Sequence, residues 1–352
     1  MAINQFNAVD PELFSRYSRQ GPRYTSYPTA NLFNPAVDEA LYRSEIARTD
    51  ARDDAPPLSL YFHIPFCDTL CYFCGCNMIV SRNRQKIASY LDVLIAEMDL
   101  MSPLLGRDRE VAQIAWGGGT PTSLEPDEIR RLTDAIRSRF TLSPDAEAGV
   151  EIDPRELRRE HVMALAESGF NRVSMGVQDF EPRVQEAVNR IQPLEVTLQA
   201  LEWVAEAGIT SVNLDLMYGL PHQTLETFAH TLDRIVEIGP DRIAVFNYAH
   251  VPWIKRHMGL IREEDLPSAD EKVRIFIATL ERLNEAGYVY VGMDHFAKPD
   301  NELAVAQRDG NFRFADRINQ FLGAQQRHRR HHHAARLQHR EIGRAHHRVV
   351  AG

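Results

Sequence analysis

Strand-like and helix-like segments alternate along most of this 352-residue chain. Several of the strand-like runs are apolar at successive positions, which is typical of parallel strands covered on both faces. The seven runs cover residues 59–64, 113–116, 149–152, 172–177, 211–217, 242–247 and 288–292. This alternation predicts an α/β fold whose parallel sheet forms a full or partial barrel.

Two segments between the runs have a clear helical period. Each places its apolar residues on one face, and Gly208 is positioned to end the second helix. The two expected faces are Ile129, Leu132, Ile136 and Phe140, and Leu198, Leu201, Val204 and Ala205.

All four cysteines of the chain fall within ten positions, at Cys67, Cys71, Cys74 and Cys76. A structural zinc site would need a second pair at a distance, and disulfides between such close neighbours would be strained. The spacing lets three thiolates converge on one inorganic cluster and leaves one iron without a cysteine ligand. We therefore expect an iron–sulfur cluster. Cys76 is left over, either as a small buried residue or with a role beside the cluster.

Polar residues collect where the predicted strands end, which is where α/β barrels carry their chemistry. The cysteine run follows the first strand, and a glycine-rich turn, residues 117–119, follows the second and lets a ligand approach the backbone. Singly, the polar residues resemble solvated loop residues or caps. Together they suggest acceptors for ligand hydroxyl groups and a guanidinium for a carboxylate. They are Glu151, Asp153, Gln178, Asp179, Arg190 on the following helix, and Asp215. His63 suits a structural or a participating role equally.

The cysteine spacing, with Phe73 before the third cysteine, resembles that of the radical S-adenosylmethionine (SAM) enzymes. This resemblance implies a partial parallel β/α barrel with a 4Fe–4S cluster on Cys67, Cys71 and Cys74. It also implies that SAM binds the fourth iron, with Phe73 near the adenine and the glycine-rich turn at its amino group. In that superfamily an electron from the cluster cleaves SAM and releases a 5′-deoxyadenosyl radical.

Further segments resemble the oxygen-independent coproporphyrinogen III oxidase family between about residue 10 and residue 310. Besides Cys76, the matching segments are 21–30, 116–121, 151–155, 171–180, 215–221, 245–250 and 292–297. The implied reaction converts two propionates of coproporphyrinogen III to vinyl groups, giving protoporphyrinogen IX. The resemblance also implies two SAM molecules, an electron donor, an electron acceptor and a monomer. The alternatives are a heme-binding chaperone of the same superfamily, or a radical enzyme such as a methyltransferase acting on another tetrapyrrole.

Residue roles are carried over from the family by matching motif. Tyr61, Gly118 and Glu151 are expected to contact the SAM bound to the cluster, and Cys76 and His63 are the candidates for a catalytic role. The residues expected to contact one SAM molecule or the other are Phe73, Gly119, Thr120, Gln178, Arg190, Asp215 and Ala249.

Charge is distributed unevenly over three expected regions. We predict an irregular N-terminal extension (residues 1–58) over the barrel, the barrel itself (59–310) and a basic tail (311–352). The tail holds nine Arg, two acidic residues and seven of the fourteen His, whereas residues 1–310 hold 31 basic and 47 acidic residues. An acidic body argues against nucleic acid as the main partner.

The sequence has no run of 18 apolar residues and no start that resembles a secretory signal. We therefore expect a cytoplasmic protein without a membrane span.

The resemblance stops at about residue 311, where the composition changes abruptly. We expect the tail to be largely disordered. A shifted reading frame is the favoured explanation, and a genuine variant tail, an artefact or metal binding by its histidines are the alternatives. Because the family continues here with catalytic sequence and a helical C-terminal domain, we expect impaired activity.

Overall fold

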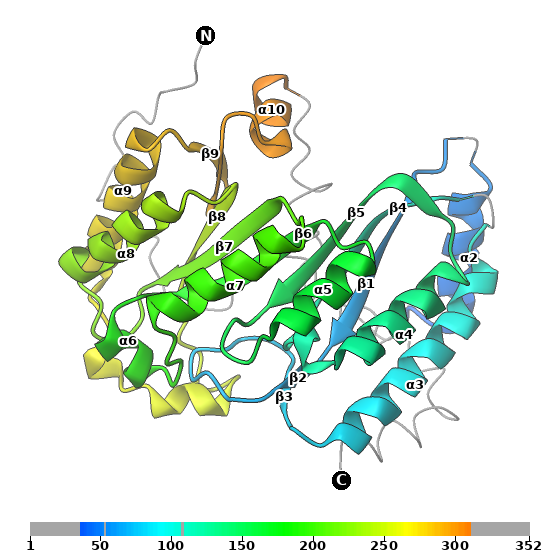
Figure 1. The fold of residues 1–352 in the computed structure, drawn as a ribbon, viewed down its shortest axis with the longest axis horizontal. Coiled ribbons are helices and arrows are strands. Elements are labelled where there is room, and N and C mark those ends of the chain that lie inside the picture. The colour runs from blue at the N-terminus through cyan, green and yellow to red at the C-terminus, as the bar shows by residue number, and fades with distance from the viewer. Residues whose placement is uncertain (1–35, 53, 107–108, 311–352) are drawn as a thin grey trace.

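The computed structural model describes residues 36–52, 54–106 and 109–310, and its centre is an eight-stranded sheet (Figure 1). Six strands run parallel, in the order β1–β4–β5–β6–β7–β8, followed by β10 and β9. They are β1 (Leu58–Ile64), β4 (Val111–Gly118), β5 (Leu142–Ile152), β6 (Arg172–Gln178), β7 (Ser211–Tyr218), β8 (Arg242–Asn247), β9 (Val289–Gly292) and β10 (His295–Ala297). Within the described residues β1 and β9 are the two edges, as in a partial barrel. The predicted α/β fold is confirmed.

The last two strands differ from the prediction. The run at 288–292 was expected to join the parallel sheet, but β9 pairs antiparallel with β10, a strand that was not expected. The chain reverses through a two-residue turn at Met293 and Asp294, which have positive φ angles of 44° and 71°. Such a turn joins antiparallel neighbours, whereas parallel strands need a long crossover.

Helices follow the strands of the sheet, and several of them lie in front of it (Figure 1). They are α3 (Arg84–Met101), α4 (Pro126–Arg137), α5 (Arg159–Glu167), α6 (Pro182–Ala187), α7 (Leu194–Glu206), α8 (Leu225–Ile238) and α9 (Ala269–Glu285). Their ends follow ordinary capping rules: Thr224 caps α8, which ends at Gly239 in the left-handed conformation. The short helix α10 (Glu302–Arg308) follows β10.

The predicted apolar faces are only partly right. Ile129, Leu132 and Ile136 are buried on α4, but Phe140 lies beyond the C-cap of that helix. In α7 the predicted face is half right, because Val204 is buried and Leu201 packs against the core, whereas Leu198 is 40% exposed and Ala205 is also exposed. The fully buried positions are Thr197, Ala200 and Val204, at the i, i+3 and i+7 positions of a helix face. Gly208 follows α7 with a φ of 76°, as expected for the residue that ends it.

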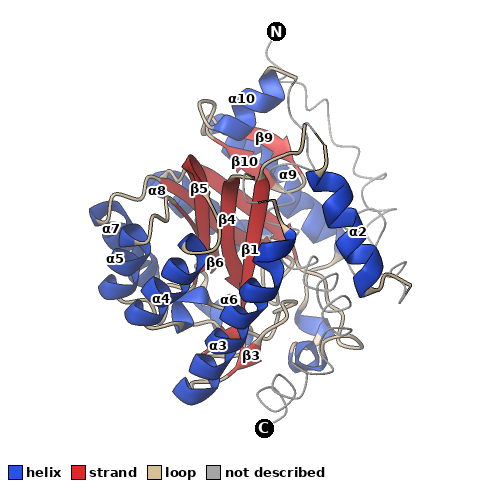
Figure 2. Cartoon of the chain, turned by 90° about the vertical axis from the view of Figure 1, so that its right-hand side faces the viewer, coloured by secondary structure: helices blue, strands red, loops and turns tan. Residues whose placement is uncertain are grey.

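Part of the N-terminal extension is regular, contrary to the expectation. Residues Glu39–Asp50 form helix α2, which begins at Asp38, whose side chain accepts a hydrogen bond from Leu41 N. An ion pair between Asp50 and Arg109 ties the helix to the segment before β4, beside the sheet (Figure 2). The segment 21–30 and the tail 311–352 lie outside the described residues, so the three region boundaries remain predictions. No helix in the described ranges is long and apolar enough to cross a membrane.

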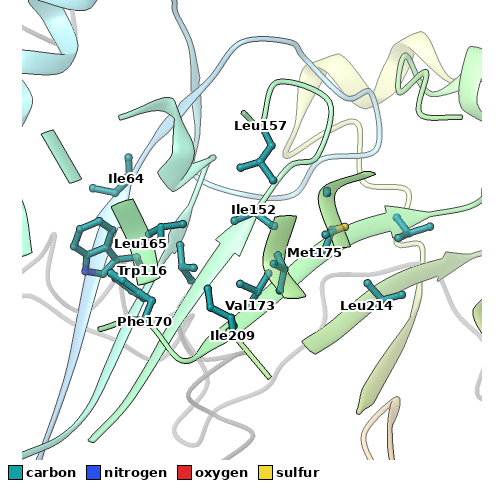
Figure 3. Close-up of a cluster of buried hydrophobic side chains, with 14 of the residues drawn as sticks. Ile64, Trp116, Ile152, Leu157, Leu165, Phe170, Val173, Met175, Ile209 and Leu214 are labelled. Atoms are coloured by element: carbon teal, nitrogen blue, oxygen red, sulfur yellow. The ribbon is translucent and has the colours of Figure 1, made fainter. Parts of the chain in front are cut away.

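The main core lies between the sheet and the helices (Figure 3). The rings of Trp116 on β4 and Phe170 before β6 meet edge-to-face at 4.7 Å between centroids. Val173 and Met175 on β6 and Leu214 on β7 are fully buried. This packing fixes the register of the parallel strands, so their carboxyl ends lie along one edge.

Candidate cofactor-binding site

The four cysteines lie in a loop that leaves the carboxyl end of β1. The base of the loop is closed by a two-stranded ribbon of β2 (Phe66–Cys67) and β3 (Ile79–Val80). Ile79 N donates to Pro65 O at 2.7 Å, and Ser81 N donates to Cys67 O at 3.0 Å. All four cysteines are free thiols. Their sulfur atoms are therefore available as ligands at the edge of the sheet.

Cationic and hydroxyl groups approach the sulfur atoms. Arg155 Nη2 and Arg190 Nη1 lie 3.3 and 3.6 Å from Cys71 Sγ, and both arginines pair with Asp153, at 2.6 and 3.0 Å. Thr120 Oγ1 lies 3.5 Å from Cys67 Sγ. Two guanidinium groups and one hydroxyl group thus lie next to two of the sulfur atoms that are expected to bind the cluster.

The thiols themselves differ in acidity. Burial raises the pKa of Cys67 to about 12. The hydrogen bond between Cys76 and Cys74 lowers the pKa of Cys74 and raises that of Cys76. Cys76 therefore lies directly beside an expected cluster ligand.

The glycine-rich turn packs against the base of the cysteine loop. Gly119 N donates to Ile64 O at 2.8 Å, and Thr120 N donates to Phe66 O at 2.7 Å. A Cβ atom on Gly119 would lie 2.5 Å from the carbonyl carbon of Pro65, so no larger residue fits there. The turn and the cysteine loop thus form one unit.

Tyr61 and His63 lie two positions apart on the same face of β1. Hydrogen bonds link them to the cysteine loop. His63 Nε2 lies 2.8 Å from Asn77 O, so it donates to that carbonyl. His63 Nδ1 then accepts from the Tyr61 hydroxyl at 3.1 Å. These contacts give His63 a structural link to the loop, and its catalytic role remains a prediction.

Two carboxyl groups face the site from β5 and β7. Glu151 accepts a hydrogen bond from Gly118 N at 3.2 Å, and burial raises the pKa of Glu151 to about 7. Asp215 accepts from Asn213 Nδ2 at 2.6 Å and from Ser174 Oγ at 3.2 Å, and burial raises the pKa of Asp215 to about 6. Both carboxyl groups can therefore bond ligand hydroxyl groups, as acceptors when ionised and as donors when protonated.

Gln178 and Arg190 complete the predicted ring, and both retain unused hydrogen-bonding atoms. Gln178 ends β6 with a φ of 70°, and its Oε1 has no partner among the described residues. Arg190 Nη2 donates to Gly176 O at 2.7 Å, while its Nε is likewise unpaired within that part of the chain. Arg190 lies after α6 rather than on a helix. Unpaired buried polar atoms are rare, which suits a site that receives a ligand.

Asp179 does not belong to the ring. Its side chain is 1% exposed and accepts hydrogen bonds from Thr231 Oγ1 at 2.6 Å, Glu181 N at 2.8 Å and the Gln223 amide. These bonds fix the turn after β6 to α8. From the sequence alone, a carboxylate that follows a strand in this structural role looks the same as one that binds a ligand.

Phe73 belongs to an apolar cluster, and Ala249 follows another member of that cluster in the chain. Phe73 is buried in a second apolar cluster that includes Cys71, Val188 and Tyr248. Ala249 follows Tyr248 beyond the end of β8 and is partly exposed. Phe73, a residue of the cysteine loop, thus packs into this apolar cluster.

The sequence prediction missed four residues whose side chains contact the cysteine loop, one of which is Asn189, whose Nδ2 donates to Leu70 O at 2.8 Å. Arg155 pairs with Asp153 two positions before it, and an arginine this close to a predicted site carboxylate could have been included in the prediction. Lys255 Nζ and His257 Nε2 lie 2.7 Å from the carbonyl oxygens of Cys76 and Cys74. Nothing local in the sequence marks these two residues, because the contacts span 179 and 183 positions.

The residues present fit a 4Fe–4S cluster and SAM by their donor chemistry. No three His, Cys, Asp or Glu side chains in the described ranges are arranged to hold a single metal ion. In a cluster, by contrast, separate cysteines bind separate irons. A glycine cradle, two carboxyl groups and a guanidinium with unused donors suit an amino acid and a ribose.

The comparisons with known proteins agree with this geometry. Residues 61–235 match the model of the radical SAM superfamily. The oxygen-independent coproporphyrinogen III oxidase of Helicobacter pylori is 45% identical over 306 residues, covering 87% of this chain and 67% of the relative. The enzyme of the same name from Salmonella typhimurium is 50% identical over 301 residues, covering 86% of this chain. The chain belongs to the oxygen-independent coproporphyrinogen III oxidase family of radical SAM proteins.

A solved structure supports the same assignment. The coproporphyrinogen III oxidase HemN from Escherichia coli, a radical SAM enzyme, superimposes with a TM-score of 0.78 at 49% identity and covers 82% of this chain. The chain spans about 65% of the length of that structure and of the Salmonella relative. Membership of the radical SAM family implies a 4Fe–4S cluster and SAM as cofactors.

Proposed function

We propose that this chain catalyses the oxygen-independent oxidative decarboxylation of coproporphyrinogen III. Two propionate side chains would become vinyl groups, giving protoporphyrinogen IX. The observation that carries the proposal is the shared unit of cysteine loop and glycine-rich turn, faced by Glu151, Asp215 and Arg190. The names of the relatives at 45–50% identity support the substrate.

The chain's own residues would hold both cofactors. Cys67, Cys71 and Cys74 are the proposed cluster ligands, and the iron without a cysteine is the proposed SAM site. When bound, the reduced cluster would supply the electron that cleaves SAM and thereby the radical that removes a hydrogen atom from substrate.

Two SAM molecules are part of the proposal. Tyr61, Gly118 and Glu151 would contact the molecule at the cluster. The unpaired Nε of Arg190 suits a carboxylate, and the acceptors on Gln178 and Asp215 suit hydroxyl groups. The other proposed contacts to one molecule or the other are Phe73, Gly119, Thr120 and Ala249.

The net reaction at each propionate needs no protein acid or base. One hydrogen atom leaves the carbon β to the carboxylate, carbon dioxide leaves, and an electron acceptor takes the remaining electron. The protein's task is to position the reacting carbon and exclude water. Phe73 and Tyr248, both buried in the same apolar cluster, would contribute to that exclusion. A cytoplasmic monomer served by a separate reductant remains our expectation.

The test is an anaerobic assay of the reconstituted chain with SAM, a reductant and coproporphyrinogen III. We expect 5′-deoxyadenosine and protoporphyrinogen to form together, and mass spectrometry to record the loss of two carbon dioxide molecules per substrate. Cys71→Ala is the matched control and should yield neither product. Gain of a methyl group, or tight heme binding without turnover, would contradict the proposal.

A further inference from the structure

The cysteine loop has little backbone structure of its own. Within residues 68–78 the structure has one internal backbone hydrogen bond, from Cys74 N to Cys71 O at 3.1 Å. The ribbon of β2 and β3 closes the base but does not reach Cys74 or Cys76. Something else must hold this part of the loop in one conformation, because ordering free backbone is entropically costly.

Side chains from other elements supply that restraint. Four carbonyl groups of the loop accept hydrogen bonds from side chains that are distant in the sequence. The bonds are Asn189 Nδ2 to Leu70 O (2.8 Å), His257 Nε2 to Cys74 O (2.7 Å), Lys255 Nζ to Cys76 O (2.7 Å) and His63 Nε2 to Asn77 O (2.8 Å). Two of the four come from the single segment that follows β8.

That segment is itself firmly anchored. Lys255 N donates to Val251 O at 3.0 Å, and Met258 N donates to Lys255 O at 2.9 Å, at the start of a 3₁₀ turn over Arg256–Leu260. Val251 and Met258 are buried in the apolar cluster that also contains Cys71 and Phe73. The segment is therefore packed against the same loop whose carbonyl groups it bonds.

We propose that Lys255 and His257 are positioning residues that fix Cys74, the third proposed cluster ligand, through the carbonyl groups on and beyond it. This inference rests on the proposed cluster. The geometry is specific, because the two donors bond carbonyl groups two residues apart and so hold the short Cys74–Cys76 segment at both ends. Loss of either donor would leave a carbonyl group unpaired and the segment free to move.

The first test uses the chain without a cluster. Lys255→Met and His257→Ala remove the two donors, and Arg256→Ala is the matched control on the same turn, where Arg256 is exposed. Thiol alkylation by iodoacetamide, followed by mass spectrometry at each cysteine, reports local mobility. Because the Lys255 charge lowers the pKa of Cys74, the rates are compared at equal thiolate fraction. We then expect alkylation of Cys74 and Cys76 to rise about fivefold in the two donor variants, on the scale of a lost hydrogen bond, with Cys67 unchanged.

The second test uses the reconstituted protein. Iron release to a chelator should be about tenfold faster in the Lys255→Met, His257→Ala double variant than in the parent or in Arg256→Ala, a typical effect for outer-shell residues. Lys255→Arg and His257→Gln retain a donor and should restore the parent rate. Thermal melting of the cluster-free variants identifies any that fail to fold. In that case the iron-release rates of the two conservative variants decide whether the donors hold the loop.

Two outcomes would overturn the inference. One is unchanged alkylation of Cys74, and the other is an equal increase at all four cysteines, which would indicate general loosening. If the parent chain binds no cluster, the proposed function fails, while the alkylation result still decides whether these side chains hold the loop.

Discussion

Gly118 is a residue where backbone conformation and close packing impose the same requirement. Its φ is 116°, and a Cβ atom would lie 2.3 Å from Cε1 of His63. His63 cannot withdraw without losing its bonds to Asn77 and Tyr61. The glycine is therefore needed for the fold of the site, apart from any contact with SAM.

Gly118→Ala should destabilise the cluster-free protein by about 2 kcal/mol, because it combines backbone strain with a clash. Chemical denaturation measures the free energy of unfolding. Gly75→Ala is the control, since its Cβ would meet nothing within 4 Å. Equal effects of the two substitutions would contradict the packing argument.

Glu151 should make the stability of the cluster-free protein depend on pH. An ordinary glutamate loses its proton near pH 4.3, whereas burial raises the pKa of Glu151 to about 7 in the folded chain. Between these values the folded state binds more protons than the unfolded state, so stability falls as pH rises and the loss persists above pH 7.

Glu151→Gln removes this titration and keeps an acceptor for Gly118 N. Between pH 4.5 and pH 8, the free energy of unfolding of the variant should rise relative to that of the parent by on the order of 1 to 3 kcal/mol. Denaturation curves across that range measure the difference. Parallel curves for the two proteins would show that Glu151 titrates normally.

At the scale of elements, substitutions in the cysteine loop should distinguish the three proposed cluster ligands from Cys76, which is not a ligand in our account. Cys67→Ala, Cys71→Ala and Cys74→Ala should each lose most of the bound iron and sulfide after reconstitution. Cys76→Ala should retain them, because its thiol bonds Cys74 rather than serving as a ligand in our account. Iron and acid-labile sulfide analysis decides this, and loss of iron in Cys76→Ala would make Cys76 a ligand.

Helix α10 is fixed to the amino ends of the strands by charge. The carboxylate of Glu302 pairs with Arg172 and Arg242, whose side chains are 7% and 6% exposed. Glu302 is itself partly exposed, but removing its carboxylate takes one negative partner away from two buried guanidinium groups.

Glu302→Ala should therefore cost about 2 kcal/mol of unfolding free energy, less than for a fully buried pair because Arg172 also pairs with Glu147 at 3.0 Å. Glu206→Ala, which breaks an exposed pair with Arg159, is the control and should cost less than about 1 kcal/mol. Similar costs for both variants would mean that α10 is held by packing alone.

Elements with a strong local pattern were predictable from the sequence. Parallel strands such as β6 and β7 are apolar runs, and the cysteine loop is recognised by the spacing of its cysteines. The antiparallel strand β10 has three residues and follows a turn without the usual glycine, so no local signal marks it. Helix α2 has no buried residue, which explains why its apolar pattern was too weak to predict a helix.

At the scale of the whole molecule, the sheet brings together residues that the sequence separates widely. Cys67, Glu151 and Asp215 could be assigned to one site because the carboxyl ends of parallel strands meet. The exposure of Leu198 on α7 and the inward position of Asp179 could not be predicted, since both depend on contacts with other elements. The same holds for Lys255 and His257, whose partners are set by tertiary packing alone.

The central claim is that three cysteines hold a cluster with one iron open to SAM. The most direct measurement is electron paramagnetic resonance of the reduced, reconstituted chain before and after addition of SAM. We expect a 4Fe–4S signal whose g values change when SAM is added, in the parent and in Cys76→Ala alike. A signal that SAM leaves unchanged, with the cluster intact, would contradict the account.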